Sequence, residues 1–112
     1  MDISVVVPVY NEEESISESV RRLKSVLESM TANYEIILVN DGSRDGTMSI
    51  IEGLASNDKA LKIISFSRNF GHQLAVSAGM KYSSGDCVVI IDADLQDPPE
   101  LIPAMYEKCR EG

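Results

Sequence analysis

Four short apolar runs alternate with helical patterns along the whole chain, and this alternation constrains the fold more than any other feature. The runs are rich in β-branched residues and occupy residues 3–9, 35–39, 61–66 and 87–91. Because nearly every position in them is apolar, they are typical of strands that are buried on both faces of a sheet. After each run, apolar residues recur every three or four positions, as on one side of an amphipathic helix. The sequence therefore predicts four strand–helix units.

The helical patterns cover residues 16–30, 48–55, 74–82 and the segment that follows position 97. Ser15 and Glu18 have the spacing of a capping box for the first helix, and Asp97 and Glu100 have it for the fourth. Short strand–helix units imply a parallel sheet with right-handed crossovers and helices on both faces. We therefore expect one doubly wound α/β domain, with a mostly parallel sheet of four βα units, across residues 1–112.

Charge and hydropathy exclude several functions. The chain has 18 acids and ten Lys or Arg, a net charge of −8, which argues against binding to nucleic-acid phosphates. No apolar run approaches the ~20 residues that cross a bilayer, and the start lacks the basic flank of a signal peptide. We therefore expect a soluble chain on the cytoplasmic side. Cys87 and Cys109 lack CxxC spacing, which favours two buried, reduced thiols.

Polar segments follow all four predicted strands, at the edge where a doubly wound sheet binds its ligands. They begin at Pro8 (PVYNE), Asn40 (NDGS), Ser67 (SRNFGH) and Asp92 (DADLQD). No GxGxxG follows the first strand, and no GxxxxGK[ST] occurs in the sequence. The usual dinucleotide-binding and P-loop functions are therefore not indicated.

Asp92 and Asp94 form the strongest acidic pattern, because a two-residue spacing in extended chain points both carboxylates to the same side. Such oxygens suit Mg²⁺ or Mn²⁺, and Mg²⁺ completes its shell with water and phosphate oxygens. With Asp97 and Glu100 close by, a diphosphate would be repelled unless a divalent ion bridged the charges. The pattern indicates a metal-assisted diphosphate site. Solvated loop acids or helix caps are the simpler alternative.

Five motifs together resemble those of the inverting family 2 glycosyltransferases: VVVPVYNEEESI, ILVNDGSRDGT, FSRNFGHQLAVSAGM, SSGD and IIDADLQDPPELI. Their order and spacing are most similar to the polyprenyl-phosphate branch, which comprises the dolichyl- and undecaprenyl-phosphate glycosyltransferases. The match runs from residue 3 to the end of the sequence. The resemblance implies a GT-A fold whose Rossmann-like half binds a nucleotide-sugar donor together with Mg²⁺ or Mn²⁺.

The resemblance also assigns roles to single residues in the donor pocket. Tyr10 and Glu12 match the motif that lines the nucleoside pocket, with Glu12 at the ribose, and Asp41 matches the acid that reads the uracil or guanine edge. Arg68 and Asn69 belong to a branch signature that is expected to line the pocket. The full nucleotide-sugar-binding set is Pro8, Val9, Tyr10, Glu12, Asp41, Ser43, Gly71, His72, Ala75, Asp92, Ala93 and Asp94.

For the metal, the resemblance places Asp92 toward the ribose and the ion, makes Asp94 a direct ligand, and adds Gln96 as a further ligand. Members of the family carry a second half of the sheet with the acceptor site and the general base, and the polyprenyl-phosphate branch often adds membrane helices. This chain thus resembles the N-terminal, donor-binding part of a membrane-associated enzyme, with no catalytic base of its own. An open sheet edge predicts self-association.

Three functions are consistent with the sequence. The first is transfer of a hexose from a UDP- or GDP-sugar to an acceptor, a polyprenyl phosphate, with inversion and metal assistance. The second is a non-catalytic nucleotide or nucleotide-sugar binding module. The third is a metal-dependent phosphotransferase, since IIDAD looks like a strand that ends in DxD, but here DxD follows the fourth strand and Gln96 replaces the expected Thr or Val.

Several site residues also have simpler interpretations. Asp41 with Gly42 is a common turn signal, and Tyr10 could belong to the core. Glu13 and Glu14 suit the positive end of the first helix. A lone histidine such as His72 is more often a surface or packing residue than a catalyst.

Overall fold

The computed structural model describes residues 2–31, 33–93 and 98–111, and it contains the four predicted strand–helix units. In chain order the elements are β1 (Ile3–Val9), α1 (Ile16–Met30), β2 (Tyr34–Asn40), α2 (Thr47–Ser56), β3 (Leu61–Ser65), α3 (His72–Lys81), β4 (Cys87–Ile90), a single 3-10 turn η1 (Pro99–Leu101) and α4 (Ile102–Glu111).

The four strands form one parallel sheet in the order β3-β2-β1-β4. The chain runs outward from β1 to β3 and then returns to the free side of β1, so that the strand order reverses beside β1. In register, Val6 of β1 lies between Ile37 of β2 and Ile90 of β4. This topology confirms the predicted doubly wound α/β fold.

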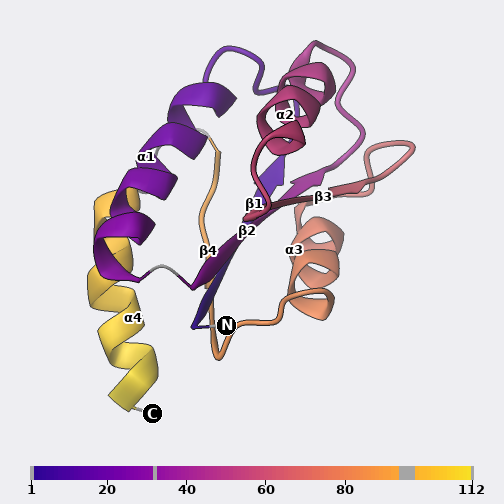
Figure 1. Ribbon diagram of the computed structural model, residues 1–112. Helices are drawn as coiled ribbons and strands as arrows, with labels where there is room; N and C mark the ends of the chain where they lie inside the picture. Colours follow the sequence, from indigo (N-terminus) through magenta and orange to yellow (C-terminus); the bar gives the residue numbers. More distant parts are fainter. Residues whose placement is uncertain (1, 32, 94–97, 112) are drawn as a thin grey trace.

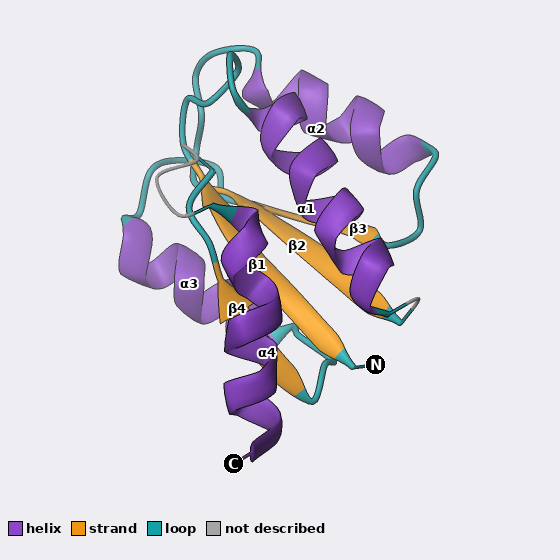
Figure 2. Ribbon diagram, turned by 90° about the vertical axis from the view of Figure 1, so that its left-hand side faces the viewer, coloured by secondary structure: helices purple, strands orange, loops and turns teal. Residues whose placement is uncertain are grey.

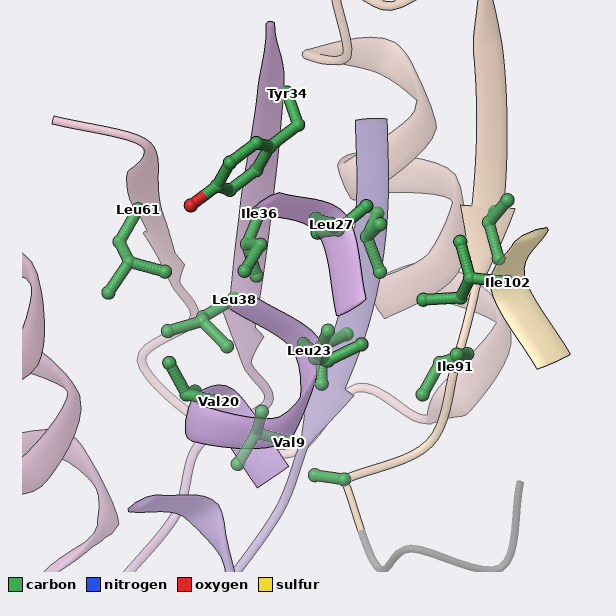
Figure 3. Packing of buried hydrophobic residues seen from close by; sticks show 14 of the residues in the cluster. Val9, Val20, Leu23, Leu27, Tyr34, Ile36, Leu38, Leu61, Ile91 and Ile102 are labelled. Carbon is green, nitrogen blue, oxygen red and sulfur yellow. The ribbon is translucent and has the colours of Figure 1, made fainter. Parts of the chain in front are cut away.

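Two layers of unequal size cover the sheet. Helices α1, α2 and α4 lie on one face, while α3 lies alone on the other (Figures 1 and 2). The larger core is on the three-helix face, and Figure 3 shows Leu23 and Leu27 of α1 over the side chains of β1 and β2. The smaller core consists of Val6, Ile37 and Val39 under Ala75 of α3. Most of the buried apolar area is therefore on the side away from α3.

Helix α3 sits very close to the sheet because its inner face carries small residues. Ala75 is fully buried, and a Cβ added at Gly79 would lie 2.2 Å from Cγ1 of Val6. A larger residue at position 79 would push the helix outward, so Gly79 sets the distance between α3 and β1.

The prediction that all four strands are buried on both faces is correct for β1 and β2 and wrong for β3 and β4. Every residue of β1 and β2 is buried, whereas Val88 and Ile90 of β4 are 36% and 39% exposed. Both β4 residues point to the α3 side, where one helix is too narrow to cover four strands. The edge strands therefore leave apolar side chains in contact with solvent.

A buried acid holds the loop between α3 and β4. Glu35 accepts hydrogen bonds from the hydroxyl of Ser4 and from the amide of Ser84 (2.6 Å), and it pairs with Lys62. The amide of Gly85 donates to Ser4 Oγ at 2.7 Å. Burial opposes ionisation of Glu35, but the hydrogen bonds from Lys62, Ser4 and Ser84 outweigh it and lower its pKa. The SSGD segment is thus held to β1 and β2 by hydrogen bonds to Ser4 and Glu35.

The cysteines correct the sequence prediction of two reduced thiols. Cys87 at the start of β4 and Cys109 in α4 form a disulfide across 22 residues of sequence, with their Cα atoms 6.1 Å apart. Cys87 is buried, but Cys109 is exposed. The prediction failed because it considered only local spacing, whereas the packing of α4 against β4 brings the two residues together.

The predicted capping box at Ser15 is also wrong. Ser15 precedes α1, but its hydroxyl makes no cap and instead donates to the carboxylate of Glu12 at 2.9 Å. The cap predicted for the fourth helix, Asp97, lies outside the described residues. Within the described ranges, no helix is both long enough and apolar enough to cross a membrane.

Candidate functional site

A pocket of about 350 Å³ opens at the carboxyl ends of β1 and β4, where the strand order reverses. All four polar segments predicted from the sequence contribute to it, although 80 residues separate Glu12 of the first segment from Asp92 of the last. The lining residues are Pro8, Val9, Tyr10, Glu12, Asp41, Asn69, Gly71, His72, Asp92 and Ala93.

The segment after β1 supplies an apolar floor and one acid. Val9 is buried, and the ring of Tyr10 is 43% exposed beside it. Asn11 takes a positive φ of 51°, which turns the chain toward α1. The amide of Glu12 then donates to Thr47 Oγ1 at 2.9 Å. A rigid turn therefore holds both Tyr10 and Glu12 at the pocket.

Asp41, at the end of β2, organises the neighbouring loop. Its carboxylate is 4% exposed and accepts three hydrogen bonds, from the amide of Phe70 (2.7 Å), the amide of Gly71 (3.1 Å) and Nδ2 of Asn69 (3.0 Å). These donors offset the cost of burying a charge. Gly42 follows with a φ of 71°, and a Cβ there would lie 2.2 Å from the backbone of Arg68. The two loops are therefore packed backbone to backbone.

The start of α3 forms the opposite wall of the pocket. Gly71 has a φ of 104°, a conformation that suits glycine, and His72 is the first residue of the helix. Nε2 of His72 lies 3.1 Å from Oδ1 of Asp92, which joins α3 to the segment after β4. The first amides of any helix lack helical acceptors and carry a partial positive charge. This wall is therefore suited to an anion.

The segment after β4 is fixed against α1 through its backbone. The carbonyl of Ala93 accepts a hydrogen bond from Ser19 Oγ at 2.6 Å, and Ser15 Oγ lies 3.4 Å from the same oxygen. Ser19 is a buried polar residue on the apolar side of α1. This contact determines where the acidic segment leaves the sheet.

Carboxylates dominate the electrostatics of the pocket. Glu12, Asp41 and Asp92 contribute acids, and His72 is the one titratable base among the described lining residues. Groups of three or more His, Cys, Asp and Glu that could hold a metal do not occur within residues 2–31, 33–93 and 98–111. The predicted ligands Asp94 and Gln96 lie outside those ranges. A diphosphate in this pocket would need a cation in addition to the N-terminus of α3.

Most residues of the predicted donor site come together in this pocket. Of the described members, Ser43 and Ala75 lie elsewhere: Ser43 Oγ accepts a hydrogen bond from the amide of Asn11 (2.9 Å), and Ala75 is buried on the side of α3 that faces the sheet. The predicted members that line the pocket are Pro8, Val9, Tyr10, Glu12, Asp41, Gly71, His72, Asp92 and Ala93.

The sequence analysis did not identify two residues that support the pocket. Ser19 and Thr47 hold the backbones of Ala93 and Glu12, and both are buried. Ser19 lies three residues after Ile16 and four before Leu23, on the apolar stripe of its helix. A polar residue on an apolar stripe indicates a buried hydrogen bond, and this pattern could have identified Ser19 from the sequence.

Comparisons with known proteins agree with this fold. Residues 4–112 match the family model described as glycosyl transferase family 2. The uncharacterized glycosyltransferase YkcC of Bacillus subtilis (strain 168) is 56% identical over 97% of this chain and 34% of its own length. The bactoprenol glucosyl transferase of Shigella phage SfV is 47% identical over 100% of this chain and 36% of its own length.

Among solved structures, the mannosyltransferase PcManGT from Pyrobaculum calidifontis, in complex with GDP-Man and Mn²⁺, superimposes with a TM-score of 0.75. The two sequences are 27% identical, and the superposition covers 91% of this chain and 30% of the PcManGT chain. The chain therefore spans about a third of the length of the proteins it matches.

Proposed function

The chain belongs to glycosyl transferase family 2 and has the GT-A fold, and from this premise we propose that its pocket holds the nucleotide part of a UDP- or GDP-sugar. In the whole protein, the hexose then passes to a polyprenyl phosphate, with inversion at the anomeric carbon and with help from Mg²⁺ or Mn²⁺. Residues 1–112 form the nucleotide-sugar-binding part of that enzyme. We assign the acceptor site and the general base to the additional polypeptide that the longer relatives possess.

The location and lining of the pocket carry this proposal. The pocket lies where the strand order reverses, which is the place where open α/β sheets bind their ligands. It combines an apolar floor and an aromatic ring with carboxylates and a helix N-terminus. This combination fits the three parts of a nucleotide: a flat base, a ribose with hydroxyl donors, and a diphosphate.

For the nucleoside, Tyr10 offers an exposed ring face against which a base can stack, and Pro8 and Val9 form the apolar surface beside it. Glu12 and Asp92 offer acceptors for ribose hydroxyls. Asp41 has three of its roughly four acceptor positions filled by the loop that precedes α3, which leaves about one for an N–H of the base.

For the diphosphate, the N-terminus of α3 supplies amide donors and a favourable dipole. The oxygens of Asp92, Asp94 and Gln96 are the type of donor that Mg²⁺ and Mn²⁺ prefer. When bound, a divalent ion would neutralise the charge that develops on the departing diphosphate. The structure of PcManGT with GDP-Man and Mn²⁺ supports a requirement for a divalent metal ion in this fold.

The acceptor is proposed from the relatives. The bactoprenol glucosyl transferase of phage SfV matches the whole of this chain, and bactoprenol is a polyprenol. In the proposed reaction, an oxygen of the lipid phosphate attacks the anomeric carbon as the bond to the diphosphate breaks, so that one C–O bond replaces another with inversion.

Calorimetric titration tests the donor site. The chain is titrated with UDP, GDP, UDP-glucose and GDP-mannose, each with and without Mn²⁺. We expect one nucleotide to bind in a metal-dependent way, and we expect Asp92→Asn to weaken that binding about tenfold or more. The matched control is Asp86→Asn, an exposed acid before β4 and remote from the pocket. Absence of binding by the folded chain, or equal affinities for the two variants, would contradict the proposed site.

A further inference from the structure

We propose that the sheet face covered by α3 is a docking surface for an anionic lipid bilayer. The proposal rests on the distribution of charge and exposed apolar side chains over the molecule, and it does not depend on the nucleotide pocket.

Charge is strongly segregated along the chain. Residues 59–85 contain four Lys or Arg and no acid, whereas the rest of the sequence contains all 18 acids and only six Lys or Arg. This acid-free segment forms β3, α3 and the loops around them. The acid beneath it, Glu35, is buried and paired with Lys62. The exposed Asp86 lies only at the edge of this segment, so the face has little negative charge, although the protein as a whole is acidic.

Exposed apolar side chains collect on the same face. Val88 and Ile90 are in register with Ser4 and Val6, whose side chains point toward α3. They join four residues of α3 and its flanks, so that six of the eight large apolar residues found exposed in the described structure are on this side. These six are Phe70, Leu74, Met80, Tyr82, Val88 and Ile90.

The outer side of α3 combines positive charge with exposed apolar side chains. A groove of about 350 Å³ with almost entirely apolar walls runs along the helix, lined by Phe66, Phe70, Leu74, Ser77, Ala78 and Lys81. The guanidinium of Arg68 lies 4.8 Å from the ring centre of Phe70, and Nζ of Lys81 lies 5.7 Å from that of Tyr82. Aromatic rings with adjacent cations are typical of surfaces that sit at the level of lipid headgroups.

Charge complementarity favours a bilayer over a second copy of this chain. In a symmetric dimer through this face, Arg68 and Lys81 would meet the same cations of the partner copy. An anionic leaflet, by contrast, attracts each such cation near its surface. The helices of the opposite face, α1, α2 and α4, carry five acids together with five Lys or Arg, whereas β3 and α3 carry two lysines and no acid, so the α3 face is the one that favours an anionic lipid (Figure 2).

This orientation has a consequence that rests on the proposed function. The pocket is bounded by Gly71 and His72 at the start of α3, next to Phe70. With the α3 face on the bilayer, the rim of the pocket lies at the level of the lipid phosphates. A polyprenyl phosphate could then reach the donor sugar without leaving the membrane.

Vesicle co-sedimentation tests the docking surface. The chain is mixed with vesicles of phosphatidylcholine alone and with vesicles that contain phosphatidylglycerol, both without any polyprenyl phosphate. We expect binding to the anionic vesicles only, weakened by salt. The double variant Leu74→Gln, Lys81→Glu should reduce the partition coefficient about tenfold. The matched control, Leu101→Gln with Lys108→Glu, makes the same changes on the α4 side and should leave it unchanged.

The outcomes separate this proposal from others. Equal loss in both double variants would show that only net charge matters, and absence of binding to anionic vesicles would overturn the docking surface. If the Leu74→Gln, Lys81→Glu variant instead converts a dimer to a monomer in sedimentation velocity, the face binds a second copy and the proposal is wrong. Circular dichroism checks folding, and retained nucleotide binding shows that the two proposals succeed or fail separately.

Discussion

Oδ2 of Asp41 accepts a hydrogen bond from the backbone amide of Gly71 at 3.1 Å, which ties the end of β2 to the residue that precedes α3. Thirty residues of sequence separate the two. Gly71 and His72 line the pocket together with Asp41 itself. The acid therefore shapes one wall of the pocket before any ligand arrives.

Replacing Asp41 should loosen this wall. In Asp41→Ala the amides of Phe70 and Gly71 and the side chain of Asn69 lose their acceptor, and each buried unpaired donor costs about 1–3 kcal/mol. We expect the free energy of unfolding in urea to fall by about 2 kcal/mol or more. Asp41→Asn, which keeps one acceptor oxygen, should lose less. A change below about 0.5 kcal/mol in Asp41→Ala would contradict the assigned role.

The packing of α3 on β1 can be tested with two glycines. In Gly79→Ala the new Cβ would lie 2.2 Å from Val6, so we expect overpacking to cost about 1–3 kcal/mol. Gly53, within α2, has no atom within 4 Å of the same added Cβ, and Gly53→Ala should stabilise the chain by about 0.5–1 kcal/mol. Both values come from urea unfolding. The same sign for the two substitutions would contradict the described packing.

Acid should destabilise the fold through Glu35. Its pKa in the folded chain is lower than the ordinary value of 4.5, so its contribution to stability is present above that pH and is lost as the pH falls through the folded pKa. We expect the free energy of unfolding to decline as the pH drops below 4.5, measured by urea unfolding at several pH values. Glu35→Gln should make this decline shallower. An unchanged slope in Glu35→Gln would show that other acids account for it.

Reduction of the disulfide should destabilise the chain. A bridge between Cys87 and Cys109 closes a loop of 22 residues, for which the chain-entropy model gives about 3 kcal/mol. We expect dithiothreitol and the substitution Cys109→Ser to lower the free energy of unfolding by similar amounts. Thiol titration of the denatured, unreduced protein should find no free sulfhydryl. Two titratable thiols would instead restore the sequence-based prediction.

The four strands and the parallel sheet of alternating strand–helix units could be predicted because they depend on local periodicity. The family could be predicted because its motifs are contiguous in the chain. The sequence also placed Tyr10, Glu12 and Asp92 at one edge, since the carboxyl ends of parallel strands must meet there. These predictions needed no knowledge of how distant side chains pair.

What the sequence did not predict depends on contacts between distant segments. The hydroxyl of Ser15 bonds to Glu12 rather than capping its helix, and Cys109 reaches Cys87 only because α4 packs on β4. Ala75 was expected at the donor site because it lies in a motif, yet one turn of helix places it in the core. Burial of edge strands likewise depends on how many helices cover each face.

Nuclear magnetic resonance of the ¹⁵N-labelled chain gives the most direct test of whether the pocket beside β1 and β4 binds a nucleotide. UDP and GDP are added in turn with Mg²⁺, and amide shifts are followed. We predict that one of them shifts the amide resonances of Tyr10, Gly71, His72 and Ala93, while those of Gly53 on α2 and Glu107 on α4 stay unchanged. Shifts that centre instead on the groove between α1 and β3, beside Lys24 and Asp58, would contradict it.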